Sequence, residues 1–210
     1  MGKVFFSVTM SLDGLIAPQS MAEGGSSDGW IGPWLELQKY VFKQRFFREN
    51  LKLGDGGETG QDNRILEETF NRTGASIMGK RMFDGGEIHW PEEAPFHTPV
   101  FVLTNEVRGP WERPGGTTFH FVNDGIVSAL RQARDAAGGK DVRIAGGAQA
   151  IHQYLNAGLV DEFSVAVSPV LLGAGVRLFE GIDETRIALD IREAISSPMV
   201  THLSYAVNHR

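Results

Sequence analysis

The most informative part of the sequence is Asp141-Val-Arg-Ile-Ala-Gly-Gly-Ala-Gln-Ala-Ile-His-Gln-Tyr-Leu155. Val142 to Ala145 form a short, mostly apolar run, which is typical of a buried strand. The pair Gly146-Gly147 follows, and Ile151 and Leu155 then recur at helical spacing. A strand, a glycine turn and a helix bring unpaired backbone N–H groups and the positive end of a helix dipole together. Such a turn can hold a pyrophosphate, or it can serve only to pack the helix tightly on the strand.

Composition limits the classes of protein that this chain can represent. The 210 residues are 41% hydrophobic and 22% charged, as in a soluble globular domain, and the net charge of −6 argues against non-specific nucleic-acid binding. No apolar run approaches the roughly 20 residues that span a bilayer, so no membrane partner is expected. Zero cysteines exclude disulfides and thiolate sites and fit a cytoplasmic protein, while the six scattered histidines predict no metal site.

Strand and helix patterns predict an α/β fold in a single domain over residues 1–210. Helices are expected at 62–73 and from Ile126 to Ala137, between strands that share a mainly parallel sheet. Two antiparallel strands at the C-terminus would lie at one edge of that sheet. The expected strands outside the opening stretch are Val4–Met10, Ala75–Met78, Pro99–Thr104, Thr117–Val122, Asp161–Ser168, Ile187–Ile195 and Val200–Val207.

The segment 18–60 breaks the alternation of strands and helices. Glycines frame it at Gly24-Gly25 and Gly56-Gly57, and one plausible helix runs from Trp34 to Leu53. So long an insertion between a strand and a helix predicts a lid or a substrate loop.

Three of the predicted parallel strands end in residues suited to a ligand. These ends meet at one rim of the sheet, where open α/β sheets bind their ligands. Lys80 and Arg81 follow the glycine that ends one strand, and such a cation pair suits a ribose 2′-phosphate, although either residue alone would be a solvated surface charge. The three turns are Gly79-Lys80-Arg81, Thr104-Asn105 and Gly146-Gly147-Ala148-Gln149.

Five short motifs resemble one known superfamily. The chain resembles the dihydrofolate reductase-like superfamily, and specifically the branch of the reductase domain of riboflavin-biosynthesis deaminase-reductases. The resemblance covers nearly the whole chain, and it implies a dihydrofolate reductase-like sandwich of one sheet flanked by helices. The motifs are Ser11-Leu-Asp-Gly14, Ile77-Met-Gly-Lys-Arg-Met-Phe83, Val102-Leu-Thr-Asn105, Ile144-Ala-Gly-Gly-Ala148 and Ser168-Pro-Val-Leu-Leu-Gly-Ala-Gly175.

The resemblance implies an NADPH-dependent oxidoreductase that transfers hydride to a small planar heterocycle or to a conjugated carbonyl or imine. A true dihydrofolate reductase and a nucleotide-binding protein without turnover remain alternatives. The resemblance also implies a homodimer, for which the C-terminal strands offer an apolar edge. NADPH would be bound by Gly79, Lys80, Arg81, Met82, Thr104, Asn105, Gly146, Gly147, Ala148 and Gln149, with Ala17 near the nicotinamide.

Hydride transfer also needs a proton source. Folate reductases place a carboxylate early on the helix before the Met-Gly turn, and that place falls on Asn63. Glu67, one turn further along the same face, is the first candidate for the substrate-facing acid, with a solvated helix face at Glu67-Glu68 as its alternative, and Asp62 is the second candidate. Asp13 is the third, with a purely turn-stabilising role as its alternative.

Overall fold

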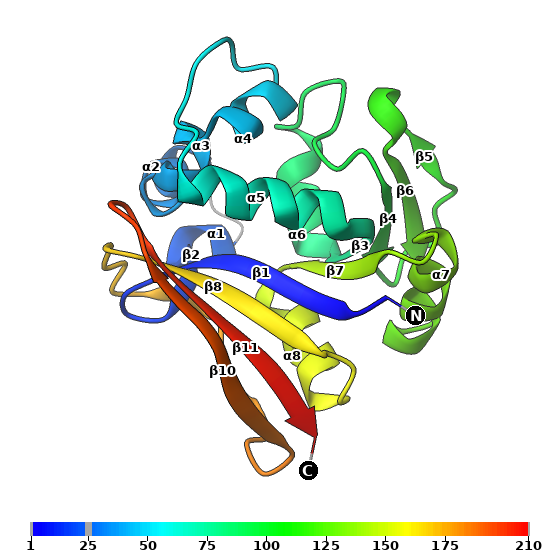
Figure 1. Ribbon diagram of the computed structural model, residues 1–210. Coiled ribbons are helices and arrows are strands. Elements are labelled where there is room, and N and C mark those ends of the chain that lie inside the picture. Colours follow the sequence, from blue (N-terminus) through cyan, green and yellow to red (C-terminus); the bar gives the residue numbers. More distant parts are fainter. Residues whose placement is uncertain (1, 24–26, 210) are drawn as a thin grey trace.

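The computed structural model describes residues 2–23 and 27–209, and within these residues nine strands form one sheet (Figure 1). Their order across the sheet is β10-β11-β8-β1-β7-β3-β4-β6-β5. A small second ladder pairs β2 (Leu15–Pro18) with β9 (Gly175–Arg177). The strands of the large sheet are β1 (Val4–Ser11), β3 (Thr73–Gly79), β4 (Pro99–Leu103), β5 (Trp111–Glu112), β6 (Thr118–Val122), β7 (Asp141–Gly146), β8 (Glu162–Ser168), β10 (Ile187–Ser196) and β11 (Thr201–His209).

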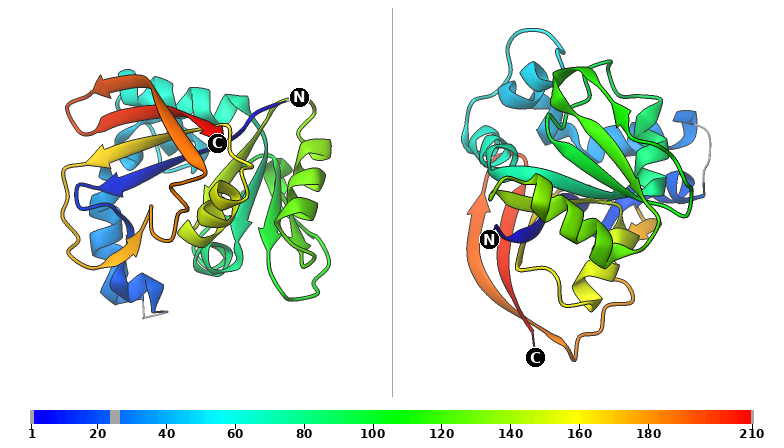
Figure 2. Two further views of the ribbon diagram at one scale, coloured as in Figure 1. Left: turned by 90° about the horizontal axis from the view of Figure 1, so that it is seen from below. Right: turned by 90° about the vertical axis from the view of Figure 1, so that its right-hand side faces the viewer.

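The sheet is mainly parallel, as predicted. β8, β1, β7, β3, β4 and β6 all run in one direction, so their carboxyl ends share one rim. The two C-terminal strands β10 and β11 add to β8 in the antiparallel sense. Both views of Figure 2 show this hairpin, in orange and red, at the edge of the sheet far from the green strands β4 and β6. The α/β class and the antiparallel C-terminal strands are thereby confirmed.

Helices cover both faces of the sheet (Figure 1). Alternate residues of a strand face opposite ways, and β3 shows the division. Met78 packs with Phe83 of α6 (Lys80–Glu87), whereas Ile77 packs in the cluster that contains α7 (Ile126–Ala136) and α8 (Ala148–Asn156). The helix α5 (Gln61–Arg72), expected at 62–73, lies on the same face as α6. No helix of the described ranges 2–23 and 27–209 is long and apolar enough to cross a membrane.

The expected single helix from Trp34 to Leu53 is wrong. The described part of segment 18–60 instead contains α1 (Gln19–Ala22), α2 (Ser27–Leu37), α3 (Lys39–Lys43) and α4 (Arg45–Asn50), and of these α3 and α4 lie beside α5 (Figure 1). Gln44 has ψ of 135°, an extended conformation that ends α3 and begins α4. The short helices pack on α5 and on the sheet, so tertiary contacts rather than a continuous apolar stripe hold them. The Gly24-Gly25 pair lies outside the described residues.

The face of β1 and β8 that lies under α5 and the short helices is polar. Ser7 and Thr9 of β1 lie opposite Ser164 and Ala166 of β8 on this face. On the other face, Phe6 stacks on Phe163 with ring centroids 4.6 Å apart. The hydroxyl of Thr9 bonds to the Gln38 side chain and that of Ser164 to the Ser204 hydroxyl, so this face, called the polar face below, holds buried hydrogen bonds beside its apolar contacts.

Candidate cofactor and substrate site

The chain after β3 and the chain after its neighbour β7 cross to strands on opposite sides of this pair. β3 continues through α6 to β4 on one side, and β7 continues through α8 to β8 on the other. The two strands are parallel and hydrogen-bonded, with Met78 opposite Gly146 near their carboxyl ends. Such a topological switch point leaves a crevice beyond the carboxyl ends of the two strands, where α/β proteins bind their ligands.

Two helices begin in this crevice, and a glycine precedes each. Gly79 precedes α6 and Gly147 precedes α8, and no side chain caps either helix. The backbone N–H groups of both first turns therefore have no helical partner and can bind an anion. A Cβ added at Gly79 would lie 3.9 Å from the backbone nitrogen of Gly147, so the two turns are in contact.

Position 146 requires a glycine. Its φ of 126° is a conformation that other residues rarely adopt, and an added Cβ would approach the sulfur of Met82 to 3.2 Å. The peptide bond between Gly146 and Gly147 is cis. A Cβ added at Gly147 itself would have no atom within 4 Å. The two turns thus present bare backbone donors to open space, which fits the pyrophosphate of a dinucleotide.

The turn after β4 lies next to α6, because Leu103 is opposite Gly79 in the sheet. The Thr104 N–H donates to the carbonyl of Val122, and its hydroxyl accepts a hydrogen bond from the Glu106 N–H at 3.0 Å. Asn105 is exposed between them. The sequence-predicted turns at 79–81, 104–105 and 146–149 are therefore brought to one rim.

The two cations of this rim differ in their surroundings. Lys80 Nζ lies 2.6 Å from an Asp84 oxygen and 3.2 Å from a Glu106 oxygen. The hydrogen bond to Asp84, aided by the one to Glu106, raises the pKa of Lys80. Arg81 is exposed, and none of the salt bridges found in the described part of the chain involves it. A 2′-phosphate would therefore meet one uncommitted guanidinium and one ammonium that already has carboxylate partners.

Ala17 lies further along the rim, in the small ladder that follows β1. It pairs with Val176 of β9, and a Cβ added at Gly175 would come within 2.1 Å of the Ala17 carbonyl oxygen. The close approach of the two strands fixes the position of the Ala17 backbone beside the end of β1.

The third acid candidate, Asp13, is held in a turn. Its carboxylate accepts hydrogen bonds from Ser11 Oγ at 2.6 Å, from the Gly173 N–H at 2.7 Å and from the Leu172 N–H at 3.2 Å. The hydrogen bond from Ser11, and after it those from the backbone, lower the pKa of Asp13 to about 2. A group that stays ionised at neutral pH cannot supply a proton there, so the geometry favours the turn-stabilising alternative.

Asp62, the second candidate, is buried at the start of α5. One of its oxygens lies 2.8 Å from His202 Nε2, and the other accepts the Ser197 hydroxyl at 3.0 Å. Asp62 and His202 are each 5% exposed. Sequence reasoning did not find His202 or Ser197 because they lie far along the chain, although the alternation of the last strand places His202 on an inward face.

Glu67, the first candidate, is solvent-exposed, as its alternative interpretation as part of a solvated helix face predicts. Asn63, four residues earlier, is buried, and its side-chain oxygen accepts a hydrogen bond from the Phe46 N–H at 2.8 Å. The short helices α3 and α4 cover the side of α5 that carries Asn63, Leu66 and Phe70, and Glu67 lies outside this contact. The structure therefore does not bring Glu67 to the polar face, and its place as first candidate is not supported by the geometry.

Side chains that sequence analysis did not single out line the polar face. Thr9 donates to the side-chain oxygen of Gln38 at 2.8 Å, and the ring of Tyr40 lies edge-on to His202 at 5.8 Å. Burial is the main cause that raises the pKa of Tyr40 to about 12. Arg143 donates to the Ser7 carbonyl, its Nε has no partner, and burial lowers its pKa to about 10. The guanidinium of Arg143 and several neutral polar groups are thus enclosed between the helices and the sheet.

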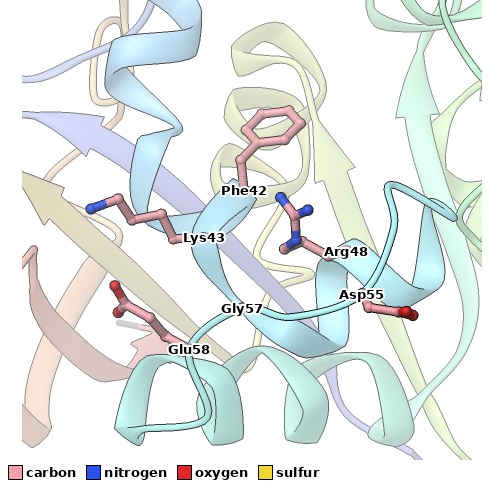
Figure 3. A pocket seen from close by; sticks show the side chains of 6 residues that line it. All are labelled: Phe42, Lys43, Arg48, Asp55, Gly57 and Glu58. Atoms are coloured by element: carbon pink, nitrogen blue, oxygen red, sulfur yellow. The ribbon is translucent and has the colours of Figure 1, made fainter.

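Two cavities of the described residues lie away from the strand switch. The larger of the two, about 330 Å³, is lined by side chains between residues 42 and 58 (Figure 3). There Phe42 and Arg48 face one another, whereas Lys43, Asp55 and Glu58 point away, so the charged groups do not converge on a ligand. The smaller, about 200 Å³, lies between Tyr40 and Ser168, at the carboxyl end of β8.

Curated relatives share sequence with this chain. It is 34% identical to the uncharacterized protein YwjB of Bacillus subtilis (strain 168) over 191 residues, which cover 89% of this chain and 88% of that protein. It is also 34% identical to the uncharacterized protein YyaP of the same organism over 86 residues, which cover 41% of this chain and only 40% of that protein.

Solved structures share the fold. A putative riboflavin biosynthesis protein from Shewanella sp. PV-4 matches with a TM-score of 0.64 at 20% identity, over 98% of this chain and 99% of that chain. The dihydrofolate reductase of Enterococcus faecalis, solved with NADP(H) and RAB-propyl, matches with a TM-score of 0.56 at 11% identity, over 99% of this chain and 97% of that chain.

The resemblance stated from the five motifs is confirmed by a family model. The model of the RibD C-terminal domain matches residues 2–201. The chain therefore belongs to the RibD C-terminal domain family and has the dihydrofolate reductase-like fold of a reductase.

Proposed function

We propose that this protein is an NADPH-dependent reductase that transfers hydride to a small planar heterocycle of the pteridine or pyrimidinone kind. The observation that carries the proposal is the contact between the two glycine turns at the strand switch. Two unpaired helix N-termini meet there, with Arg81 and Lys80 at the start of one of them. Membership of the RibD C-terminal domain family supports the same assignment.

In this proposal the bound nicotinamide supplies the hydride, and the chain positions both reactants. The N–H groups at the starts of α6 and α8 would hold the pyrophosphate, and Arg81 with Lys80 would hold the 2′-phosphate. The polar face beneath the lid would receive the acceptor ring, because its hydroxyls and Tyr40 can satisfy ring nitrogens and carbonyls. The proton would come from ordered water or from the Asp62–His202 pair, which lies on the same face.

Gly147 offers a test of the cofactor site. We expect Gly147→Ala to weaken NADPH binding at least about tenfold, since a methyl group would occupy the space that the pyrophosphate needs. The fold should not suffer, because the φ of −73° suits alanine and no atom lies within 4 Å of the added Cβ. Titration of NADPH against parent and variant measures the affinity, and thermal melting measures the stability.

Gly60→Ala is the matched control. Gly60 also precedes a helix, has a φ of −72° and has open space at its Cβ position. It lies before α5 rather than α6 or α8, so NADPH affinity should stay at the parent value. Equal NADPH affinity in all three proteins would contradict the proposed cofactor site. Steady NADPH oxidation with an acceptor from a panel of dihydrofolate, pyrimidinones and quinones would then separate a reductase from a binding protein.

A further inference from the structure

Lys80 is shared between two carboxylates that come from different elements. Asp84 lies one turn later on α6, so its contact with Lys80 is an ordinary pair within one helix. Glu106 belongs to the turn after β4 and reaches across to the same ammonium group. The Lys80 side chain is 29% exposed and that of Glu106 is 60% exposed, so the Glu106 carboxylate covers the ammonium from the solvent side.

We propose that Glu106 limits the preference of this protein for NADPH over NADH by competing with the 2′-phosphate of NADPH for Lys80. The proposal rests on the proposed function, because it concerns the residues expected to meet the adenosine ribose. It goes further in assigning a role to a carboxylate that opposes the two cations. Glu106 follows Asn105 directly, and the Thr104 hydroxyl fixes its backbone N–H at 3.0 Å.

The charges at this part of the rim explain the effect. Lys80 and Arg81 are balanced by Asp84 and Glu106, so the set is close to neutral before a ligand arrives. A phosphate with nearly two negative charges must displace Glu106 from Lys80 and is repelled by it. The 2′-hydroxyl of NADH can instead donate a hydrogen bond to the same carboxylate. Glu106 therefore disfavours NADPH and favours NADH.

Replacing the Glu106 carboxylate by an amide should change the binding affinity for both cofactors. In Glu106→Gln the repulsion and the competition disappear, so NADPH binds more tightly, while NADH loses a strong acceptor and binds more weakly. The ratio of the NADH to the NADPH dissociation constant should rise about threefold to tenfold, a modest change because exposed charges are well screened. Adenosine 2′,5′-bisphosphate should gain affinity as NADPH does, although it carries no nicotinamide.

Glu87→Gln is the matched control for the loss of one negative charge. Glu87 ends the same helix and pairs with Arg108 at 2.9 Å, about 10 Å along the helix from Lys80. Dissociation constants for NADPH, NADH, adenosine 2′,5′-bisphosphate and adenosine 5′-phosphate would be measured by calorimetry on the parent and on both variants. We expect the ratio to rise in Glu106→Gln and to stay at the parent value in Glu87→Gln.

Three outcomes would overturn the proposal, and they are distinguishable. If the parent binds NADPH but Glu106→Gln leaves the ratio unchanged, Glu106 does not limit the preference while the cofactor assignment stands. If Glu87→Gln raises the ratio equally, the effect belongs to net charge and not to the contact with Lys80. If the parent binds neither dinucleotide, the proposed function is wrong, and the role proposed for Glu106 is wrong as well.

Discussion

The carboxylate of Asp13 shows how one residue can join two distant segments. It lies at the end of β1, and it holds the backbone of Leu172 and Gly173 about 160 positions further along the chain. Its three hydrogen bonds are all donated to the ionised form, which is why its pKa falls from an ordinary 3.8 to about 2. The same charge that prevents Asp13 from acting as an acid keeps the loop after β8 attached to the rim.

This charge predicts a pH dependence. We expect Asp13→Asn to melt at a lower temperature than the parent at neutral pH. A carboxylate with a depressed pKa stabilises the fold above its unfolded pKa, and this contribution is lost as the pH falls through the folded value. The difference in melting temperature should therefore be constant above about pH 4 and should shrink between about pH 4 and pH 2. Glu67→Gln, at an exposed carboxylate, should show no such trend, and a difference that is constant throughout this range would contradict the assignment.

At the scale of elements, Asp62 connects the first turn of α5 to the β10–β11 hairpin. Its two oxygens are both used, one by His202 of β11 and the other by Ser197 in the turn between the strands. The helix is thereby fastened to the sheet at the edge where β11 joins β8. Because the pair is buried, the loss of either partner leaves a polar group without a bond.

We expect Asp62→Asn to lower the free energy of unfolding by about 1–3 kcal/mol, since the bonds to an ionised carboxylate are replaced by weaker ones. Urea unfolding of the parent and the variant measures the change. Glu67→Gln on the same helix should stay within about 0.5 kcal/mol of the parent, because its side chain is exposed. A parent-like midpoint for Asp62→Asn would show that the buried contacts do not stabilise the fold.

The sequence predicts the elements of this fold better than it predicts the partners of the site residues. The strand, glycine turn and helix at 141–155 have local signatures, and parallel order then places their ends on one rim. Nothing local could show that His202 binds Asp62 or that Glu106 reaches Lys80, since these contacts depend on which strands become neighbours. The division of 27–50 into three helices likewise follows from tertiary packing, of α2 on β1 and β2 and of α3 and α4 on α5.

At the scale of the whole molecule, β10 ends the sheet and leaves an unpaired strand edge. Leu189 and Ile191 lie two residues apart on it, and Ile191 is 74% exposed. An exposed apolar edge strand favours association with another chain, and two copies can pair symmetrically there. We therefore predict a homodimer in which two copies meet at the β10 edge.

Light scattering tests the dimer. At micromolar concentration we expect a mass near twice that of the 23.0 kDa chain. Ile191→Lys should shift the mass towards the monomer, because a charge on each copy would meet its own image across a symmetric interface. Val127→Lys, at an apolar side chain of α7 that is 70% exposed, should leave the mass unchanged. A parent mass near that of a single chain would rule out the dimer.

The central place of β1 has a consequence for synthesis on the ribosome. β1 leaves the ribosome well before its two neighbours, β7 and β8, which begin only at Asp141 and Glu162. At translation rates of about 5–20 residues per second, the strand therefore waits on the order of ten seconds before it can pair. During that time Phe5 and Phe6 have no sheet to cover them, so the nascent chain offers an apolar segment to chaperones. Chains released before residue 141 would lack both partners of their first strand and would be substrates for proteolysis rather than half-folded domains.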